Sequence, residues 1–115
     1  MIIMHHVDPE TIAELRDLLD EELDAIMLAF AQQLPVQLER LEQASPSECG
    51  ALAHALKGSA GNIGATMLAG AAGALEQAAR TGEPEAIAAA RARLCPLANA
   101  TLDELRALGA LREAP

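Results

Sequence analysis

The chain has almost no aromatic side chains and few β-branched ones. Phe30 is the only aromatic residue among 115, and Val, Ile and Thr together number 12. Strands favour aromatic and β-branched residues, so their scarcity excludes an all-β fold and argues against a doubly wound sheet. Ala and Leu, which number 26 and 18, favour helices instead. The composition therefore predicts an all-α protein.

Other features are missing as well. No apolar run approaches the ~18 residues that a membrane span needs, and the N-terminus lacks the basic region of a signal peptide. The two cysteines, Cys49 and Cys95, are too few for a disulfide framework and are predicted to be small buried hydrophobes. An apolar content of 51% argues against disorder. We therefore expect one soluble, cytoplasmic helical domain with no membrane association.

Basic residues are few, and the charge is unevenly distributed. The net charge is −9, and residues 1–48 hold eleven acidic and two basic side chains, whereas residues 49–115 hold six of each. Without a basic patch, nucleic acid is excluded as a partner. An acidic helical face is most often simply solvated. In an interface it favours a partner with some basic surface, mainly through the association rate.

Helix-start and helix-stop signals divide the chain into five helical segments. Asp8-Pro9 and Ser45-Pro46-Ser47-Glu48 are typical helix starts, the second with the pattern of a capping box, and Gly82 marks a helix end. Pro35 is expected to kink its helix without ending it, whereas Pro96 is expected to cause a kink or a local break. The predicted helices cover about 9–19, 20–41, 46–62, 65–81 and 84–111.

Short connections between these segments predict an antiparallel four-helix bundle with an additional short N-terminal helix. Residues 1–7 form a short lead, and residues 8–115 form the helical domain. His5 and His6 lie in this lead, which we expect to fray. Adjacent residues on a helix do not face each other, so the pair is not expected to bind a metal.

The third predicted helix carries an unusual outer face. On a helical wheel, one side faces the core and His54 lies almost opposite to it, with Lys57 at the edge of the outer face. The core side consists of Leu52, Leu56, Ser59 and Ile63, and the glycines that flank His54 are Gly50, Gly58 and Gly61. Each glycine inside a helix costs about 0.5–1 kcal/mol relative to alanine. Glycines around an exposed imidazole therefore indicate that something must approach it closely.

Phosphoryl chemistry suits this arrangement. A neutral imidazole is a good nucleophile near neutral pH and can form a phosphoramidate. The ammonium of Lys57 can stabilise the charge of the transferred group. No second His, Cys or acid lies near His54 in the sequence to orient it as a hydrolytic base, and no glycine-rich loop resembles a nucleotide cradle. We expect a site that holds a phosphoryl group but neither makes nor cleaves one alone.

The stretch His54-Ala55-Leu56-Lys57-Gly58-Ser59-Ala60-Gly61-Asn62-Ile63-Gly64-Ala65 resembles the signature of histidine-containing phosphotransfer (HPt) domains of multistep phosphorelays. The resemblance implies that His54 accepts a phosphoryl group from the aspartyl phosphate of a receiver domain and passes it to another receiver. Lys57 would support the phosphoryl charge, and Gly58 would give steric clearance. The chain would be a phosphotransfer protein, not an enzyme, with no ATP, metal or other cofactor of its own. Mg²⁺ would belong to the receiver.

The same resemblance implies a docking surface around the histidine. Partners would be response-regulator receivers or a hybrid sensor histidine kinase, and the protein would be a monomer. Helices before and after His54 would supply the contacts, and about half of the early apolar candidates, which include Leu19, Ile26 and Phe30, should be core instead. The predicted partner-binding residues are Ala51, Ala55, Gly61, Leu23, Met27, Glu76, Gln77 and Arg80. Glu76 and Arg80 are also spaced to pair with each other.

Two other functions remain open at this point. A non-phosphorylated adaptor could bind and inhibit a receiver or a kinase, although it would not need to keep the nucleophile. A metal-storage bundle would require paired Glu and Glu-x-x-His motifs, which the sequence lacks.

Overall fold

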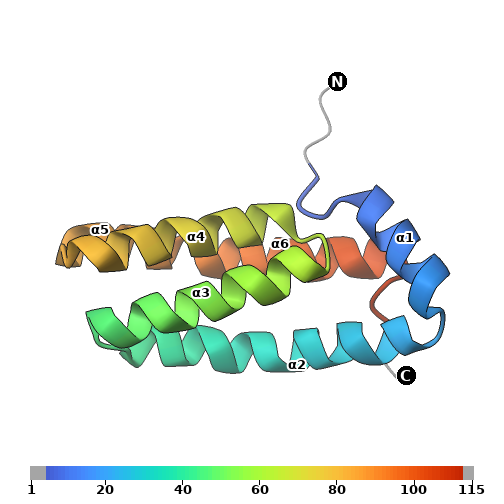
Figure 1. Ribbon diagram of the computed structural model, residues 1–115, viewed down its shortest axis with the longest axis horizontal. Helices are drawn as coiled ribbons and strands as arrows, with labels where there is room; N and C mark the ends of the chain where they lie inside the picture. Colours follow the sequence, from blue (N-terminus) through green and yellow to red (C-terminus); the bar gives the residue numbers. More distant parts are fainter. Residues whose placement is uncertain (1–4, 113–115) are drawn as a thin grey trace.

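The computed structural model describes residues 5–112, and this part of the chain is helical without any strand (Figure 1). The prediction of an all-α protein is confirmed. Residues 1–4 of the predicted lead and residues 113–115 of the predicted domain lie outside the described residues. The helices are α1 (Pro9–Leu19), α2 (Glu22–Gln43), α3 (Pro46–Asn62), α4 (Thr66–Thr81), α5 (Pro84–Ala92) and α6 (Leu94–Ala107).

The helix starts follow from local side-chain chemistry. The Asp8 carboxylate accepts the backbone N–H of Glu10 at the start of α1, where Pro9 occupies the first turn. At the start of α3, Ser45 Oγ accepts the backbone N–H of Glu48 and donates to its carboxylate 2.9 Å away. Gly82, at φ +70°, ends α4 in a left-handed conformation. Each of these signals was predicted from the sequence.

Proline acts differently at its two interior positions. α2 continues through Pro35, as expected. The last predicted helix is broken at Arg93, between α5 and α6. The ring of Pro96 would collide with the carbonyl of Ala92, the last residue of α5, and Pro96 has no N–H to donate. The predicted local break is therefore present, three residues before the proline.

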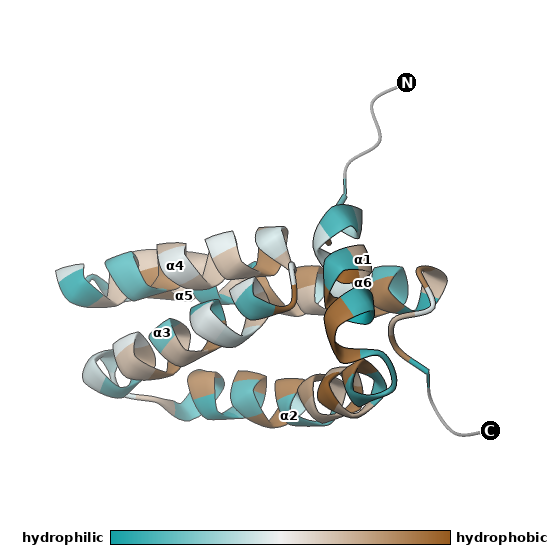
Figure 2. Cartoon of the chain, turned by 45° about the vertical axis from the view of Figure 1, so that its right-hand side comes forward, coloured by the Kyte–Doolittle hydropathy of each residue, from teal (hydrophilic) through white to brown (hydrophobic). Residues whose placement is uncertain are grey.

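Four helical stretches lie side by side. α3 and α4 are antiparallel neighbours, α2 runs along the other side of α3, and α5 and α6 return along α4, while α1 crosses one end (Figure 1). In Figure 2 the corner of α1 and α2 shows strong contrast between hydrophobic and hydrophilic residues, whereas α3 and α4 are paler. The paler colour reflects their many Ala and Gly residues. The largest fully buried side chains include Leu23, Met27, Leu34, Leu41, Leu56, Leu68, Leu75, Leu94 and Leu105.

The end of α3 is tied to the residues that precede α1. Gly64 adopts φ +77°, and a Cβ there would lie 2.9 Å from the Thr11 side chain, so the turn requires glycine. The carbonyl of Gly64 accepts the N–H of Asp8 at 2.8 Å. Gly64 therefore has a structural role in the turn between α3 and α4.

We predicted that the N-terminal lead would fray, but residues 5–7 are bound to Glu104 of α6. Its carboxylate accepts the backbone N–H groups of His6 at 2.8 Å and of Val7 at 3.3 Å. Both imidazoles also lie 3.3 Å from it, and Val7 is fully buried. Burial raises the pKa of Glu104, but the backbone hydrogen bonds and the contacts with both imidazoles together lower it further, so the net pKa lies below its usual range.

None of the helices in residues 5–112 combines the length and the hydropathy that crossing a bilayer requires.

Candidate functional site

The exposed face of α3 and α4 brings three charged or titratable side chains together. His54 and Lys57 lie one turn apart on α3, and Glu76 reaches them from α4. The His54 side chain is 68% exposed, as its position opposite the buried face predicted, whereas the Glu76 side chain is only 10% exposed. A solvent-accessible imidazole therefore rests on a largely buried carboxylate.

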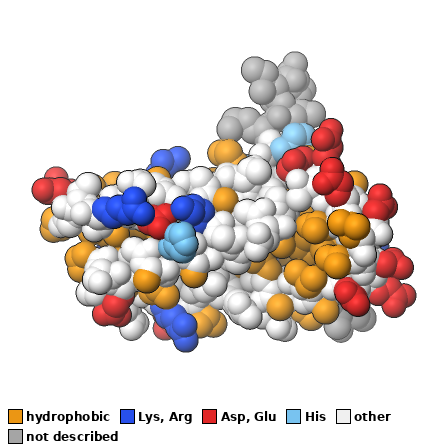
Figure 3. Space-filling model, viewed as in Figure 1, with side chains coloured by type: hydrophobic (Ala, Val, Ile, Leu, Met, Phe, Trp, Pro, Cys, Tyr) orange, Lys and Arg blue, Asp and Glu red, His pale blue; other side chains and the backbone are white. Residues whose placement is uncertain are grey.

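Each oxygen of this carboxylate has its own partner. Glu76 Oε2 lies 2.8 Å from His54 Nδ1, and Glu76 Oε1 accepts a hydrogen bond from Lys57 Nζ at 2.8 Å. The guanidinium of Arg80 lies 3.7 Å from Oε2. Figure 3 shows the cluster as a red side chain bordered by blue and pale blue ones over α3 and α4. The predicted pairing of Glu76 with Arg80 is present but is the longest of the three contacts.

The carboxylate determines which imidazole nitrogen is free. The hydrogen bond from Lys57 lowers the pKa of Glu76; burial opposes this effect and the hydrogen bond from His54 adds to it, so the net pKa lies below its usual range. An ionised carboxylate only accepts hydrogen bonds, so His54 Nδ1 carries the proton. No side chain among residues 5–112 forms a hydrogen bond with Nε2 of His54. Its lone pair is therefore available to an incoming electrophile.

No acid lies near His54 in the sequence, but the fold brings one to its ring. Glu76 follows His54 by 22 residues, and the antiparallel packing of α3 and α4 brings the two together. Its carboxylate is also too buried for the partner-facing role that the sequence suggested. The sequence did contain one indication that Glu76 has a special role, because it is the only acidic residue in α4.

The glycines of α3 differ in their surroundings. A Cβ at Gly58 or at Gly61 would meet nothing within 4 Å, so packing within the chain does not require glycine at either position. Gly50 is different: its Cβ would contact Ala79 of α4 at 3.5 Å, so it does not flank His54 on the outer face as predicted. Glycine at position 58 destabilises the helix, and the fold gives no reason for it. Its presence therefore supports a need for open space where an outside molecule approaches.

Sequence reasoning also missed Gly73. A Cβ on this residue of α4 would lie 3.3 Å from Cδ of Lys57, so the glycine leaves room for the lysine stem. Only the packing of α4 on α3 reveals this role, since nothing in the local sequence relates the two residues.

The predicted partner surface is only partly on the surface. Leu23 and Met27 are fully buried in the core, so they cannot contact a partner. Ile26 is 42% exposed, whereas Phe30 is buried and Leu19 is half-buried. The helical spacing of apolar residues shows which face of a helix is apolar, but it does not show which residues at the margin of that face are buried. The candidates that are exposed are Ala51, Ala55, Gly61, Gln77 and Arg80.

Two other burial predictions need correction. Leu52 and Ser59 are half-buried, and the fully buried side of α3 is shifted toward α4. It consists of Cys49, Ala53, Leu56 and Ala60. Cys49 is buried as predicted, and burial raises the pKa of its thiol, but Cys95 is exposed.

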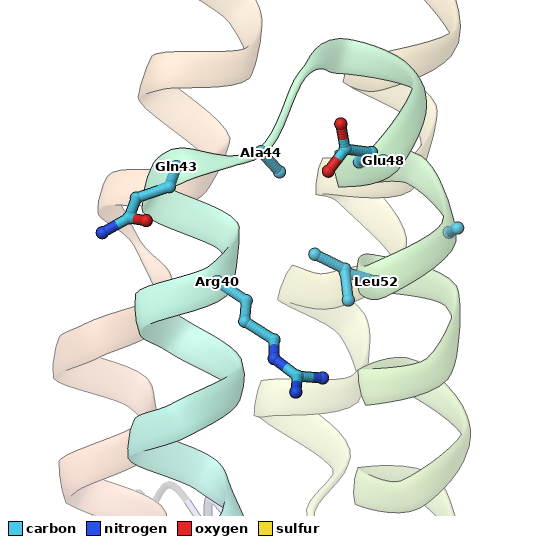
Figure 4. A pocket seen from close by; sticks show the side chains of 6 residues that line it. Arg40, Gln43, Ala44, Glu48 and Leu52 are labelled. Atoms are coloured by element: carbon cyan, nitrogen blue, oxygen red, sulfur yellow. The ribbon is translucent and has the colours of Figure 1, made fainter.

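Two hollows lie between α2 and α3. One, of about 490 Å³, is lined by residues of the α2–α3 corner, where Arg40 extends from α2 toward Leu52 (Figure 4). The other, of about 280 Å³, lies beside Ile26, Phe30 and Ile63. Neither hollow is lined by His54, so the imidazole stands on an open surface.

Metal ligands do not gather anywhere in the described part of the chain. No group of three or more His, Cys, Asp or Glu side chains within residues 5–112 could hold a metal ion. His5 and His6 instead face Glu104.

Comparison with known families decides what this site belongs to. The family model of the Hpt domain matches residues 8–113, which is nearly the whole chain. The chain belongs to the Hpt domain family. The resemblance found in the motif that starts at His54 is therefore confirmed. No curated protein and no solved structure is a significant match.

Membership in this family defines the general function. Hpt domains carry phosphoryl groups on histidine in the phosphorelays of two-component signalling, and they are carriers, not classical enzymes. Their partners are receiver domains and histidine kinases.

Proposed function

We propose that Nε2 of His54 accepts a phosphoryl group from the aspartyl phosphate of one receiver domain and passes it to a second receiver. The observation that carries this proposal is the contact between His54 Nδ1 and Glu76 Oε2 on an exposed imidazole, which favours the tautomer with its lone pair on Nε2. No other histidine in residues 5–112 combines such exposure with a buried carboxylate.

Lys57 and Gly58 complete the acceptor site in this proposal. Lys57 Nζ lies on the carboxylate beside the ring, from where the flexible side chain can reach oxygens of a phosphoryl group on Nε2. Gly58, one turn after His54, leaves open space for that group and for the edge of the receiver's site. The receiver supplies its own Asp and Mg²⁺, so this chain needs no cofactor.

The partner surface extends over exposed residues around His54. Ala51, Ala55 and Gly61 of α3 are small and present little steric hindrance to a docking domain, and Gln77 and Arg80 of α4 offer polar contacts beside them. We interpret α2, α3, α4 and the α5–α6 stretch as a four-helix bundle, with α1 as the additional N-terminal helix of a domain spanning residues 8–115. The protein would act as a monomer in the cytoplasm.

A transfer assay tests the proposal. A receiver domain carrying labelled aspartyl phosphate is mixed with the wild-type chain, with His54→Gln and with His6→Gln. The last is a matched control, because His6 also faces a carboxylate. We expect acid-labile, alkali-stable label on the wild type and on His6→Gln only. Wild-type protein that binds receivers without becoming labelled would favour the adaptor function instead.

A further inference from the structure

The buried carboxylate beside His54 has a consequence for the second half of the transfer cycle. We propose that Glu76 keeps one proton on His54 Nδ1 through both transfer steps. The phosphohistidine can then still transfer its phosphoryl group to the second receiver above neutral pH. This inference rests on the proposed function and concerns a positioning residue, since Glu76 does not touch the phosphoryl group.

The electron balance of the cycle shows why this proton matters. In the first step, the Nε2 lone pair forms the N–P bond, the P–O bond to the donor aspartate breaks, and its electron pair leaves with the carboxylate. The ring then holds the phosphoryl group on Nε2 and the proton on Nδ1, and it carries a positive charge. In the second step, the acceptor carboxylate attacks phosphorus, and the N–P electron pair returns to Nε2.

The leaving group of the second step depends on the Nδ1 proton. With the proton in place, His54 leaves as a neutral imidazole, which is the form that accepted the group. Without it, the ring would have to leave as an imidazolate anion, which is a far poorer leaving group. If the proton stays on Nδ1 throughout, neither step requires a proton transfer.

The geometry around Glu76 suits this task. Its carboxylate is 10% exposed and lies 2.8 Å from Nδ1, so its negative charge faces the positive ring of the phosphorylated state with little water between them. The other charged side chains at the ring are Lys57 of α3 and Arg80 of α4. Within residues 5–112, α2 contributes no ion pair to the cluster.

The two oxygens of Glu76 also separate two tasks. Lys57 is bound to Oε1, whereas His54 is bound to Oε2. Lys57 can therefore move to the oxygens of a phosphoryl group without releasing Nδ1. A neutral amide at position 76 could still accept the Nδ1 hydrogen bond, but it would not supply the charge that favours the protonated ring.

The decisive experiment compares pH profiles. Wild type, Glu76→Gln and Glu83→Gln are phosphorylated by a labelled receiver at pH 6.5 and separated from it. Onward transfer to a second receiver is then followed between pH 6 and pH 9. Glu83→Gln removes the same charge from an exposed position outside the site. Because the receiver is the same throughout, its own pH dependence cancels in the rate ratios.

We expect the rate for Glu76→Gln to fall relative to the other two proteins as the pH rises, by about tenfold per unit once the ring loses its proton. Loss of label to water should slow in the same way. Coincident profiles of wild type and Glu76→Gln would overturn the inference while leaving the carrier function intact. A wild type that takes up no label would instead contradict the proposed function itself.

A second measurement needs no variant. The ¹⁵N chemical shift of Nδ1 in the phosphorylated wild type reports whether this nitrogen is protonated. A protonated Nδ1 at pH 8 supports the inference, and an unprotonated one overturns it. This readout holds even if Glu76→Gln fails to fold.

Discussion

Glu76 Oε2 lies 2.8 Å from His54 Nδ1, and Oε1 of the same carboxylate lies 2.8 Å from Lys57 Nζ. One buried side chain thus binds both the imidazole ring and the ammonium group beside it. Under the proposed function, the acceptor ring and Lys57 are therefore coupled through a residue that does not contact the phosphoryl group.

Replacement of Lys57 should slow transfer without abolishing it. Lys57→Ala removes a charge-assisted interaction with the phosphoryl oxygens, which is worth about 1.5–3 kcal/mol, so acceptance should be about tenfold slower or more. The measurement is single-turnover transfer from a labelled receiver. Arg93→Ala, on an exposed residue between α5 and α6, is the control for lost positive charge. Equal rates for Lys57→Ala and wild type would reduce Lys57 to a structural partner of Glu76.

Enlarging Gly58 should block docking while leaving the helix intact. A Cβ at this position would contact nothing else in the protein. Because alanine favours a helix more than glycine does, Gly58→Ala should stabilise the protein by about 0.5–1 kcal/mol. Gly58→Leu should abolish transfer because its side chain occupies the space of the receiver. Thermal denaturation and the transfer assay together check both effects. Ala89→Leu, on the exposed face of α5, should transfer normally; retained transfer by Gly58→Leu would contradict the clearance argument.

The Glu76 cluster should make stability depend on pH. The pKa of Glu76 is lowered in the folded protein, chiefly by the hydrogen bond from Lys57. Because this pKa is lower in the folded protein than in the unfolded chain, where it is about 4.3, the ionised carboxylate stabilises the fold at pH values above about 4.3. This stabilisation is lost as the pH falls through the pKa of the folded protein. Glu76→Gln should therefore be less stable than wild type at pH 7, and the difference should shrink toward pH 3. Urea denaturation at both pH values measures it, and a constant difference would show that the carboxylate charge does not matter.

The N-terminal residues should loosen when Glu104 is changed. Its carboxylate binds the backbone N–H groups of His6 and Val7. Glu104→Ala leaves both donors without their partner, so their amide hydrogens should exchange faster with solvent. Hydrogen exchange followed by NMR checks this result. Asp103→Ala, at an exposed neighbouring position of α6, should leave both amides protected.

Asp20 carries backbone strain that glycine should relieve. It is the only non-glycine residue with a positive φ within residues 5–112, at φ 46° and ψ −119°. Such a conformation costs of order 1–3 kcal/mol for a side-chain-bearing residue, and glycine adopts it freely. Asp20→Gly should therefore raise the melting temperature, whereas Asp17→Gly within α1 should lower it. A lower melting temperature for Asp20→Gly would contradict the strain.

The sequence by itself determined much of this protein because the relevant signals are local. Caps at Asp8 and Ser45, the glycine at Gly82 and the ring of Pro96 act on backbone groups within four residues, so they place helix ends without reference to the rest of the fold. The spacing of His54, Lys57 and Gly58 likewise lies within two turns of one helix. These residues identified both the helical domain and its family.

Only the tertiary structure decided which side chains surround the His54 imidazole and which of the predicted partner-binding residues are exposed. Glu76 reaches His54, and Gly73 accommodates Lys57, because α4 packs antiparallel to α3. Leu23 and Met27 are buried although Ile26, on the same helix, is exposed. A helical period fixes the direction of a stripe, but the depth at which each residue is buried depends on how neighbouring helices lie, and that is set by the packing of the whole chain.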